Sequence, residues 1–174
     1  MLKYIFHFFV AFILTMIQQS FITGLADFSS LNILLVFLIF VTIVWGFNLG
    51  FIYAIYIGIL INIYSFLPIG TYVVIYMLLI IIIDYLYKNL LINFSLITNL
   101  LLTILATLIY SLLSVFAAYF FYYLNVINIY IDFDKQYFDA LWSQLILNII
   151  LMCIIYLAAK STIKKFNLAF LIKK

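Results

Sequence analysis

The chain has very few charged side chains and lacks arginine and glutamate altogether. Only 7% of its 174 residues are charged and 71% are hydrophobic, whereas soluble domains contain roughly 25% charged residues. A soluble fold of this length could not hide so much apolar surface, because its exterior needs polar side chains. The composition therefore predicts a single-domain integral membrane protein.

Cysteine, histidine and proline each occur once in the chain. Cys153 cannot form an intramolecular disulfide, and its apolar surroundings indicate a small packed or lipid-facing residue. His7 lies near the start of the chain and indicates an interfacial or packing residue. The sequence has no serine elbow, no glycine-rich phosphate loop and no cluster of His, Cys and acidic residues at metal-ligand spacing. We therefore expect no enzyme activity, no metal, no cofactor and no nucleic-acid partner.

Long apolar stretches cover most of the chain, and no residue from Phe28 to Ile83 is charged. A helix needs about 20 apolar residues to cross the hydrocarbon core of a bilayer. We predict an all-α, polytopic fold with six transmembrane helices, at Tyr4–Thr23, Leu31–Trp45, Leu49–Ser65, Thr71–Tyr87, Leu96–Leu124 and Ala140–Lys160. The second and third spans are separated only by residues 46–48; five or seven spans are the alternatives.

The few charges are distributed unevenly between the two sides of this predicted bundle. With six spans, one side carries all the lysines except Lys135, and the other carries all the aspartates except Asp84. An excess of lysine marks the cytoplasmic face, so we predict that both termini are cytoplasmic. A cleaved signal ending at Gly24-Leu25-Ala26 is the alternative for the first segment, and it would leave the remaining topology unchanged.

Two segments outside the spans have recognisable patterns. Residues 161–174 follow the six-span domain of residues 1–160 and place hydrophobic residues at helical spacing beside lysines. This pattern predicts a basic amphipathic cytoplasmic tail that lies on membrane lipid, or alternatively binds a protein. Residues 129–134 alternate between apolar and polar, which predicts either an extended edge for a partner or a solvated loop in which Asp139 caps the last span.

Small residues and one amide recur at every fourth position of the third predicted span: Gly50, Ala54, Gly58 and Asn62. On a helix they form a single stripe. In lipid, small residues let two helix backbones approach closely, and an amide can form a hydrogen bond across the contact. Pro68 and Gly70 then end the helix. We predict that this stripe seats another helix, either from the same chain or from a partner.

Polar residues within the predicted spans are few. Asp84 and Lys88 have the favourable spacing of an acid four residues before a lysine, which predicts a structural ion pair, with contact to a partner or an ion as the alternative. The neutral polar residues within the spans are Gln18, Gln19, Asn62, Asn99, Thr103, Thr107 and Asn148. Interhelical hydrogen bonds are their usual role. The alternative is a ligand pocket in the outer half of the bundle, where Gln18, Gln19 and Asn62 lie.

Two ordered segments resemble the MreD family: ILLVFLIFVTIVWGFNLGF (Ile33–Phe51) and IGILINIYSFLPIGTY (Ile57–Tyr72). That family has an apolar second span, glycines opening the third, an acidic or amide residue near its end, and a small-residue turn with Leu-Gly before the next span. In this chain, the corresponding residues are Gly50, Gly58, Asn62, Leu67, Pro68 and Gly70. Family members often have aspartate where this chain has Asn62.

The resemblance implies a non-catalytic scaffold of the bacterial cell-shape and elongation machinery in the inner membrane. Such a scaffold binds the bitopic protein MreC and, indirectly, connects the MreB filament with a RodA-type glycosyltransferase and its transpeptidase partner. The implied fold is similar to that of the vitamin-binding subunits of energy-coupling-factor transporters. Substrate binding in such a transporter is therefore the alternative function. The first span offers only Ala11 as a small residue for a coupling partner, which favours the scaffold.

Overall fold

The computed structural model describes residues 2–25, 28–90, 95–128 and 134–171, with side chains described within residues 4–160. These ranges confirm the all-α prediction. Their elements are α1 (Leu2–Met16), η1 (Ile17–Ile22), α2 (Ile33–Trp45), α3 (Phe47–Asn62), α4 (Thr71–Leu90), α5 (Leu96–Tyr123) and α6 (Lys135–Leu171). The π-helical η1 directly continues α1. The six helices match the six segments that the sequence predicts.

Among the described residues, four helices are long and apolar enough to cross a membrane: Tyr4–Ile22, Thr71–Asn89, Leu96–Tyr123 and Lys135–Lys160. The apolar helices α2 and α3 are shorter, with 13 and 16 residues. At the usual rise per residue they are about 20 Å and about 24 Å long. Both lengths are less than the roughly 30 Å hydrocarbon core of a bilayer.

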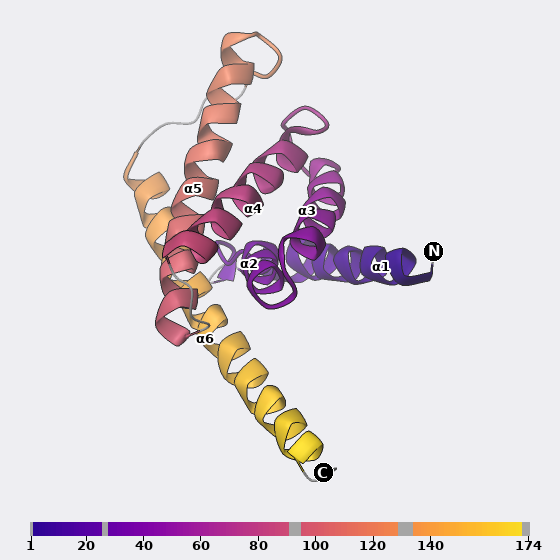
Figure 1. Ribbon diagram of the computed structural model, residues 1–174. Helices are drawn as coiled ribbons and strands as arrows, with labels where there is room; N and C mark the ends of the chain where they lie inside the picture. The colour runs from indigo at the N-terminus through magenta and orange to yellow at the C-terminus, as the bar shows by residue number, and fades with distance from the viewer. Residues whose placement is uncertain (1, 26–27, 91–94, 129–133, 172–174) are drawn as a thin grey trace.

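The short helix α2 forms the centre of the fold. It packs against α1, α3, α4, α5 and α6, and Figure 1 shows it among the other helices. A helix that is hydrophobic on all sides is suited to such a position. Its buried residues are Leu34, Leu35, Val36, Leu38, Ile39, Val41, Thr42 and Ile43.

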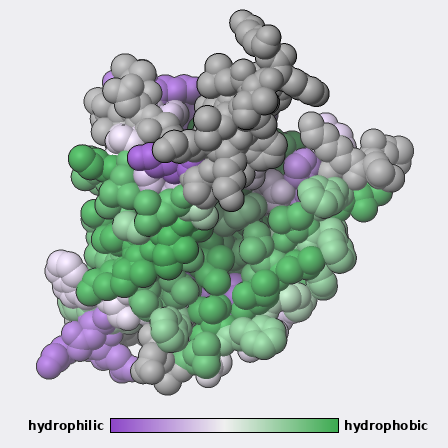
Figure 2. Space-filling view, turned by 90° about the horizontal axis from the view of Figure 1, so that it is seen from below, coloured by the Kyte–Doolittle hydropathy of each residue, from purple (hydrophilic) through white to green (hydrophobic). Residues whose placement is uncertain are grey.

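Large apolar side chains also cover the exterior. Leu112 and Phe116 on α5 and Ile97 at its start are each more than two-thirds exposed. In Figure 2, hydrophobic residues occupy most of the described surface, and hydrophilic ones gather toward opposite edges. Soluble monomers rarely expose contiguous apolar patches larger than a few hundred Å². This exterior is therefore suited to lipid, as the composition predicts.

Gly46 alone separates α2 from α3. The sequence predicts a turn over residues 46–48, but α3 already begins at Phe47. Gly46 has a φ of 89°, and its backbone N–H donates to the Thr42 carbonyl at 3.1 Å. Glycine adopts this positive φ readily, whereas side chains with a Cβ are strained there. A single residue therefore reverses the chain without a loop.

The last helix is longer than the predicted span Ala140–Lys160, because α6 begins at Lys135 and continues without a break to Leu171. The expectation that Asp139 caps it is wrong. The Asp134 carboxylate accepts a hydrogen bond from the Tyr137 N–H at 2.9 Å, and this cap fixes the earlier start. In Figure 1 the end of α6 extends away from the other helices. The predicted alternation at residues 129–133 and the side chains of the tail lie outside the described residues.

Candidate functional site

The small-residue stripe of α3 is buried against neighbouring helices of the same chain. A Cβ added at Gly58 would lie 2.6 Å from the Val73 Cα on α4, and a Cβ at Gly50 would lie 3.3 Å from the Thr42 Cα on α2. Ala54, between the two glycines, has no exposed surface. The predicted helix packing therefore occurs within the chain, where the absence of side chains lets three helices approach closely.

Asn62 ends this stripe and connects α3 to α4. Its side-chain Nδ2 donates to the Gly58 carbonyl at 2.7 Å, and its Oδ1 accepts a long hydrogen bond of 3.5 Å from the Tyr72 N–H. The turn that follows is closed by Pro68, whose carbonyl accepts from the Thr71 N–H at 3.1 Å. Asn62 is 5% exposed, so the amide stabilises the turn and does not face solvent or lipid.

Asp84 and Lys88 form the predicted ion pair near the end of α4. The Lys88 Nζ donates to the Asp84 Oδ2 at 2.7 Å. The Lys88 side chain is 63% exposed and that of Asp84 is 17% exposed. The pair thus lies at the surface, one turn apart on a single helix, and it contributes little to stability.

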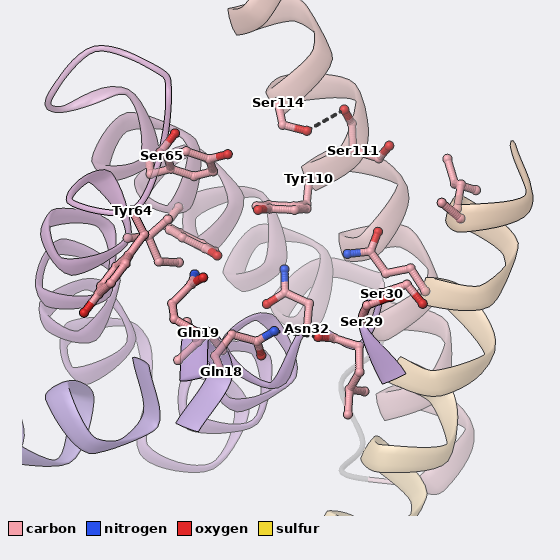
Figure 3. Close-up of a pocket in the computed structure, with 18 of the residues that line it drawn as sticks. Gln18, Gln19, Ser29, Ser30, Asn32, Tyr64, Ser65, Tyr110, Ser111 and Ser114 are labelled. Carbon is pink, nitrogen blue, oxygen red and sulfur yellow. Dashed lines mark hydrogen bonds between the residues drawn. The ribbon is translucent and has the colours of Figure 1, made fainter. Parts of the chain in front are cut away.

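A polar cavity of about 450 Å³ lies at one end of the bundle. Its lining comes from η1, the start of α2, the end of α3, the start of α4, the second half of α5 and the start of α6. Four amides border it, from Gln18, Gln19, Asn32 and Gln144. Figure 3 shows Gln19, Asn32 and Tyr110 pointing toward a shared space, with Ser111 and Ser114 above Tyr110.

Two of these amides form hydrogen bonds that fix the start of α2 beside the cavity. The Gln18 Nε2 donates to the Leu31 carbonyl at 2.7 Å, and its Oε1 accepts from the Ile33 N–H at 2.8 Å. The Asn32 Oδ1 accepts from the Leu35 N–H at 3.0 Å and caps α2. The first turn of a helix leaves backbone N–H groups without partners inside the helix. The Gln18 and Asn32 side chains each accept a hydrogen bond from one of these N–H groups of α2.

Three tyrosines form an aromatic side of the cavity. Tyr72 and Tyr76 lie one turn apart on α4, with ring centroids 6.4 Å apart. Tyr76 stacks on Tyr110 of α5 at 5.6 Å and 23°. The fully buried Tyr76 hydroxyl lies near the Tyr110 and Asn32 side chains. No hydrogen bond of ordinary geometry joins it to a described residue.

The cavity contains only part of the polar set that the sequence singles out. Gln18 and Gln19 line it, whereas Asn62, Asn99, Thr103, Thr107 and Asn148 do not. Thr103 and Thr107 donate to the carbonyls one turn earlier on α5. Sequence reasoning missed Asn32, Gln144 and the tyrosines. The i, i+4 spacing of Tyr72 and Tyr76 was the available signal, but tyrosines are also common at membrane interfaces.

A separate apolar groove of about 450 Å³ lies between the start of α4 and the second half of α5. Its lining includes the small residues Gly70, Thr71 and Ala117. Val74 and Phe116, which also line it, are 56% and 69% exposed. The groove therefore presents small residues between large apolar ones, a surface that an apolar helix can approach closely.

The described residues contain no group of three or more His, Cys, Asp or Glu residues that could hold a metal ion. His7 instead pairs with Tyr53, and the His7 Nδ1 lies 2.8 Å from the Tyr53 hydroxyl. Comparisons with known protein families, with curated proteins and with solved structures found no match for this chain.

Proposed function

We propose that this chain is a non-catalytic membrane scaffold of the MreD type, which binds an MreC-like bitopic protein. In this proposal it crosses the bacterial inner membrane six times and has both termini in the cytoplasm. Through MreC it connects the MreB filament with the RodA-type synthase and its transpeptidase partner. Lipid surrounds the apolar exterior.

One observation carries the proposal. The residues on which the MreD resemblance rests form a single closely packed unit of α2, α3 and the start of α4. Gly50 packs on Thr42 and Gly58 on the Val73 backbone, while Asn62 bonds toward Tyr72. The distinguishing residues of this motif specify helix packing, and none of Gly50, Gly58, Asn62, Leu67, Pro68 and Gly70 is an acid, a base or a nucleophile. This supports a scaffold and not an enzyme.

The positions of the charged residues support the proposed orientation. Lys88 lies at the end of α4, and the polar cavity lies at the end of the bundle where α4 begins. Asp134, at the start of α6, belongs to the cavity end. The Lys88 end also contains Asp84, and the cavity end contains Lys135 and Asp139 beside Asp134. Because Lys160 lies far along α6 from its start, the described lysines are more numerous at the Lys88 end, which agrees with a cytoplasmic face there.

The geometry also favours a particular partner surface. The stripe that includes Gly58 is occupied by α4 of the same chain, so a partner helix needs another seat. We assign this seat to the groove between α4 and α5, whose small residues permit close approach and whose walls are exposed. The single membrane span of MreC is the proposed occupant.

Cysteine cross-linking tests both the partner and its seat. In a Cys153→Ser background, Val74→Cys and Phe116→Cys line the groove, whereas Ile150→Cys on α6 is half exposed outside it. Each variant is expressed with the MreC-like protein of the same bacterium, carrying cysteines along its span. We expect cross-links from Val74→Cys and Phe116→Cys but not from Ile150→Cys. If MreC neither co-purifies nor cross-links with any variant, the scaffold proposal is wrong.

The polar cavity favours a second candidate, the substrate-binding subunit of an energy-coupling-factor transporter. A binding subunit needs polar side chains that converge in the outer half of the membrane, and Gln18 and Gln19 lie in such a cavity. Co-purification with a pair of ATPases and a coupling membrane subunit, in place of MreC, would identify this function.

A further inference from the structure

The polar cavity contains hydrogen-bonding groups that the fold itself does not use. Gln19 on η1 and Gln144 on α6 line it and are partly buried. Neither side-chain amide forms a hydrogen bond within the described part of the chain. The hydroxyl of the fully buried Tyr76 likewise has no partner of ordinary geometry there. Buried polar groups are almost always hydrogen-bonded, so the Tyr76 hydroxyl lacks an expected partner. The two partly buried amides are free to bond a molecule in the cavity that they line.

Other polar groups in the lining have structural partners and are not part of this set. Gln18 uses both ends of its amide to hold the start of α2. The Ser111 hydroxyl lies 2.7 Å from the Tyr137 hydroxyl, and the Ser114 hydroxyl donates to the Ser111 carbonyl. The three groups assigned to the ligand are therefore distributed over η1, α4 and α6.

The lining also restricts the charge of the ligand. Among the residues that the structure describes, the lining contains no aspartate, glutamate, lysine, arginine or histidine. An ion held in a low-dielectric site needs an opposite charge close by, so the lining is suited to an uncharged molecule. Amides and hydroxyls both donate and accept hydrogen bonds, which matches hydroxyl and amide groups on the ligand.

The aromatic side of the cavity indicates a ring. Tyr72, Tyr76 and Tyr110 follow one another, with Tyr76 and Tyr110 stacked. Flat aromatic side chains pack well on other rings and on the apolar faces of sugars. The volume of about 450 Å³ lies within the range of about 300–1,000 Å³ that is usual for small-molecule sites.

We propose that this cavity binds an uncharged small molecule that carries a ring together with hydroxyl or amide groups. Gln19, Gln144 and the Tyr76 hydroxyl form its hydrogen bonds. This chemistry occurs both in free metabolites and in the sugar headgroups of glycolipids. The inference does not depend on the scaffold function, since a scaffold and a transporter subunit would each present the same lining.

The test compares the ligand content of purified proteins. Wild type, Gln19→Ala/Gln144→Ala, Tyr76→Phe and the control Asn89→Ala are expressed in the native host and purified from its membranes. Asn89 is exposed on α4, bonds only to its own helix at Tyr85 and does not line the cavity. Each protein is denatured, and the compounds released into aqueous and organic fractions are identified by mass spectrometry.

Wild type and Asn89→Ala are expected to release one uncharged ring compound in near-stoichiometric amount. The double variant lacks two hydrogen-bonding side chains, which at about tenfold in affinity each weaken binding about a hundredfold. A site that is nearly full in the wild type is then expected to release about tenfold less compound. Tyr76→Phe removes a single hydroxyl and decides the outcome if the double variant does not fold. A compound in the aqueous fraction identifies a free metabolite, and an acylated compound in the organic fraction identifies a glycolipid.

Three results would overturn the inference. The first is wild-type protein without an enriched compound. The second is a charged compound, which contradicts the neutral lining. The third is equal retention by wild type and by the folded variants. None of these results bears on cross-linking to MreC, so the inference can fail while the scaffold function stands.

Discussion

The side-chain oxygen of Asn148 on α6 accepts a hydrogen bond from the backbone N–H of Asn32, at 3.0 Å, just before α2 begins. The Asn148 Nδ2 also donates to the Thr107 hydroxyl on α5 at 3.1 Å. Asn148 has no exposed surface. One amide thus joins three helices beneath the cavity and fixes where α2 starts.

Replacing Asn148 with leucine should lower the free energy of unfolding by about 1–2 kcal/mol, because the buried Asn32 N–H loses its acceptor. Thermal unfolding in detergent micelles measures the change. The control is Asn89→Leu, since Asn89 is exposed and bonds only within α4. Equal midpoints for the two variants would contradict a structural role for Asn148.

Gly58→Ala should destabilise the protein by about 1–3 kcal/mol, because a Cβ there meets the α4 backbone and forces two helices apart. The added atom would lie 2.6 Å from the Val73 Cα. Gly24→Ala is the matched control, since its Cβ would meet only ordinary contacts of 3.5 and 3.6 Å. Unfolding midpoints within error of each other would show that α3 and α4 do not need this close approach.

Asn62→Asp tests whether a carboxylate can replace the amide, as the family pattern suggests. The Asn62 Nδ2 donates to the Gly58 carbonyl at 2.7 Å, and an ionised carboxylate has no proton to donate there. We expect a loss of about 1–3 kcal/mol in unfolding free energy at neutral pH. Wild-type stability for Asn62→Asp, together with a clear loss for Asn62→Leu, would mean that accepting from the Tyr72 N–H is sufficient.

Asp134→Ala should shorten α6 at its start and cost about 1 kcal/mol, the usual value for a lost N-cap. The Asp134 carboxylate is the acceptor for the Tyr137 N–H. Asp139 lies within the first turns of α6, so Asp139→Ala should have a much smaller effect. Amide hydrogen exchange at residues 136–138 distinguishes the two. Faster exchange in Asp139→Ala than in Asp134→Ala would reverse the assignment.

The sequence predicts the helices well because their signals are local. Uncharged apolar runs are long enough to identify each segment, and the i, i+4 spacing of Asp84 and Lys88 suffices to predict their ion pair. The stripe was predicted for the same reason. The sequence left open whether its neighbour is internal, since a glycine pattern does not identify the facing helix. The structure places Val73 of the same chain there.

The cavity could not be predicted in this way. Its open groups come from Gln19, Tyr76 and Gln144, which are far apart in the sequence and lie on three different elements. Each has an ordinary interpretation alone: a polar residue at a helix end or a tyrosine at a membrane interface. Only the packing of η1, α4 and α6 around α2 brings them together. The start of α6 was misplaced for a related reason, since Asp134 and Asp139 are both plausible caps in the sequence.

The shortness of α3 has a consequence for the surrounding bilayer. Ile59 and Ile63, near its end, are 51% and 72% exposed, so in the proposed six-span arrangement lipid tails would contact a helix of only 16 residues. A hydrophobic surface shorter than the hydrocarbon layer compresses the lipid beside it, at a cost of a fraction of a kcal/mol per ångström. The long helices α5 and α6, on the other side of the bundle, would instead stretch the lipid layer beside them. The proposed arrangement therefore creates a step in membrane thickness around the protein, and this step favours neighbours whose own spans are short on the α3 side.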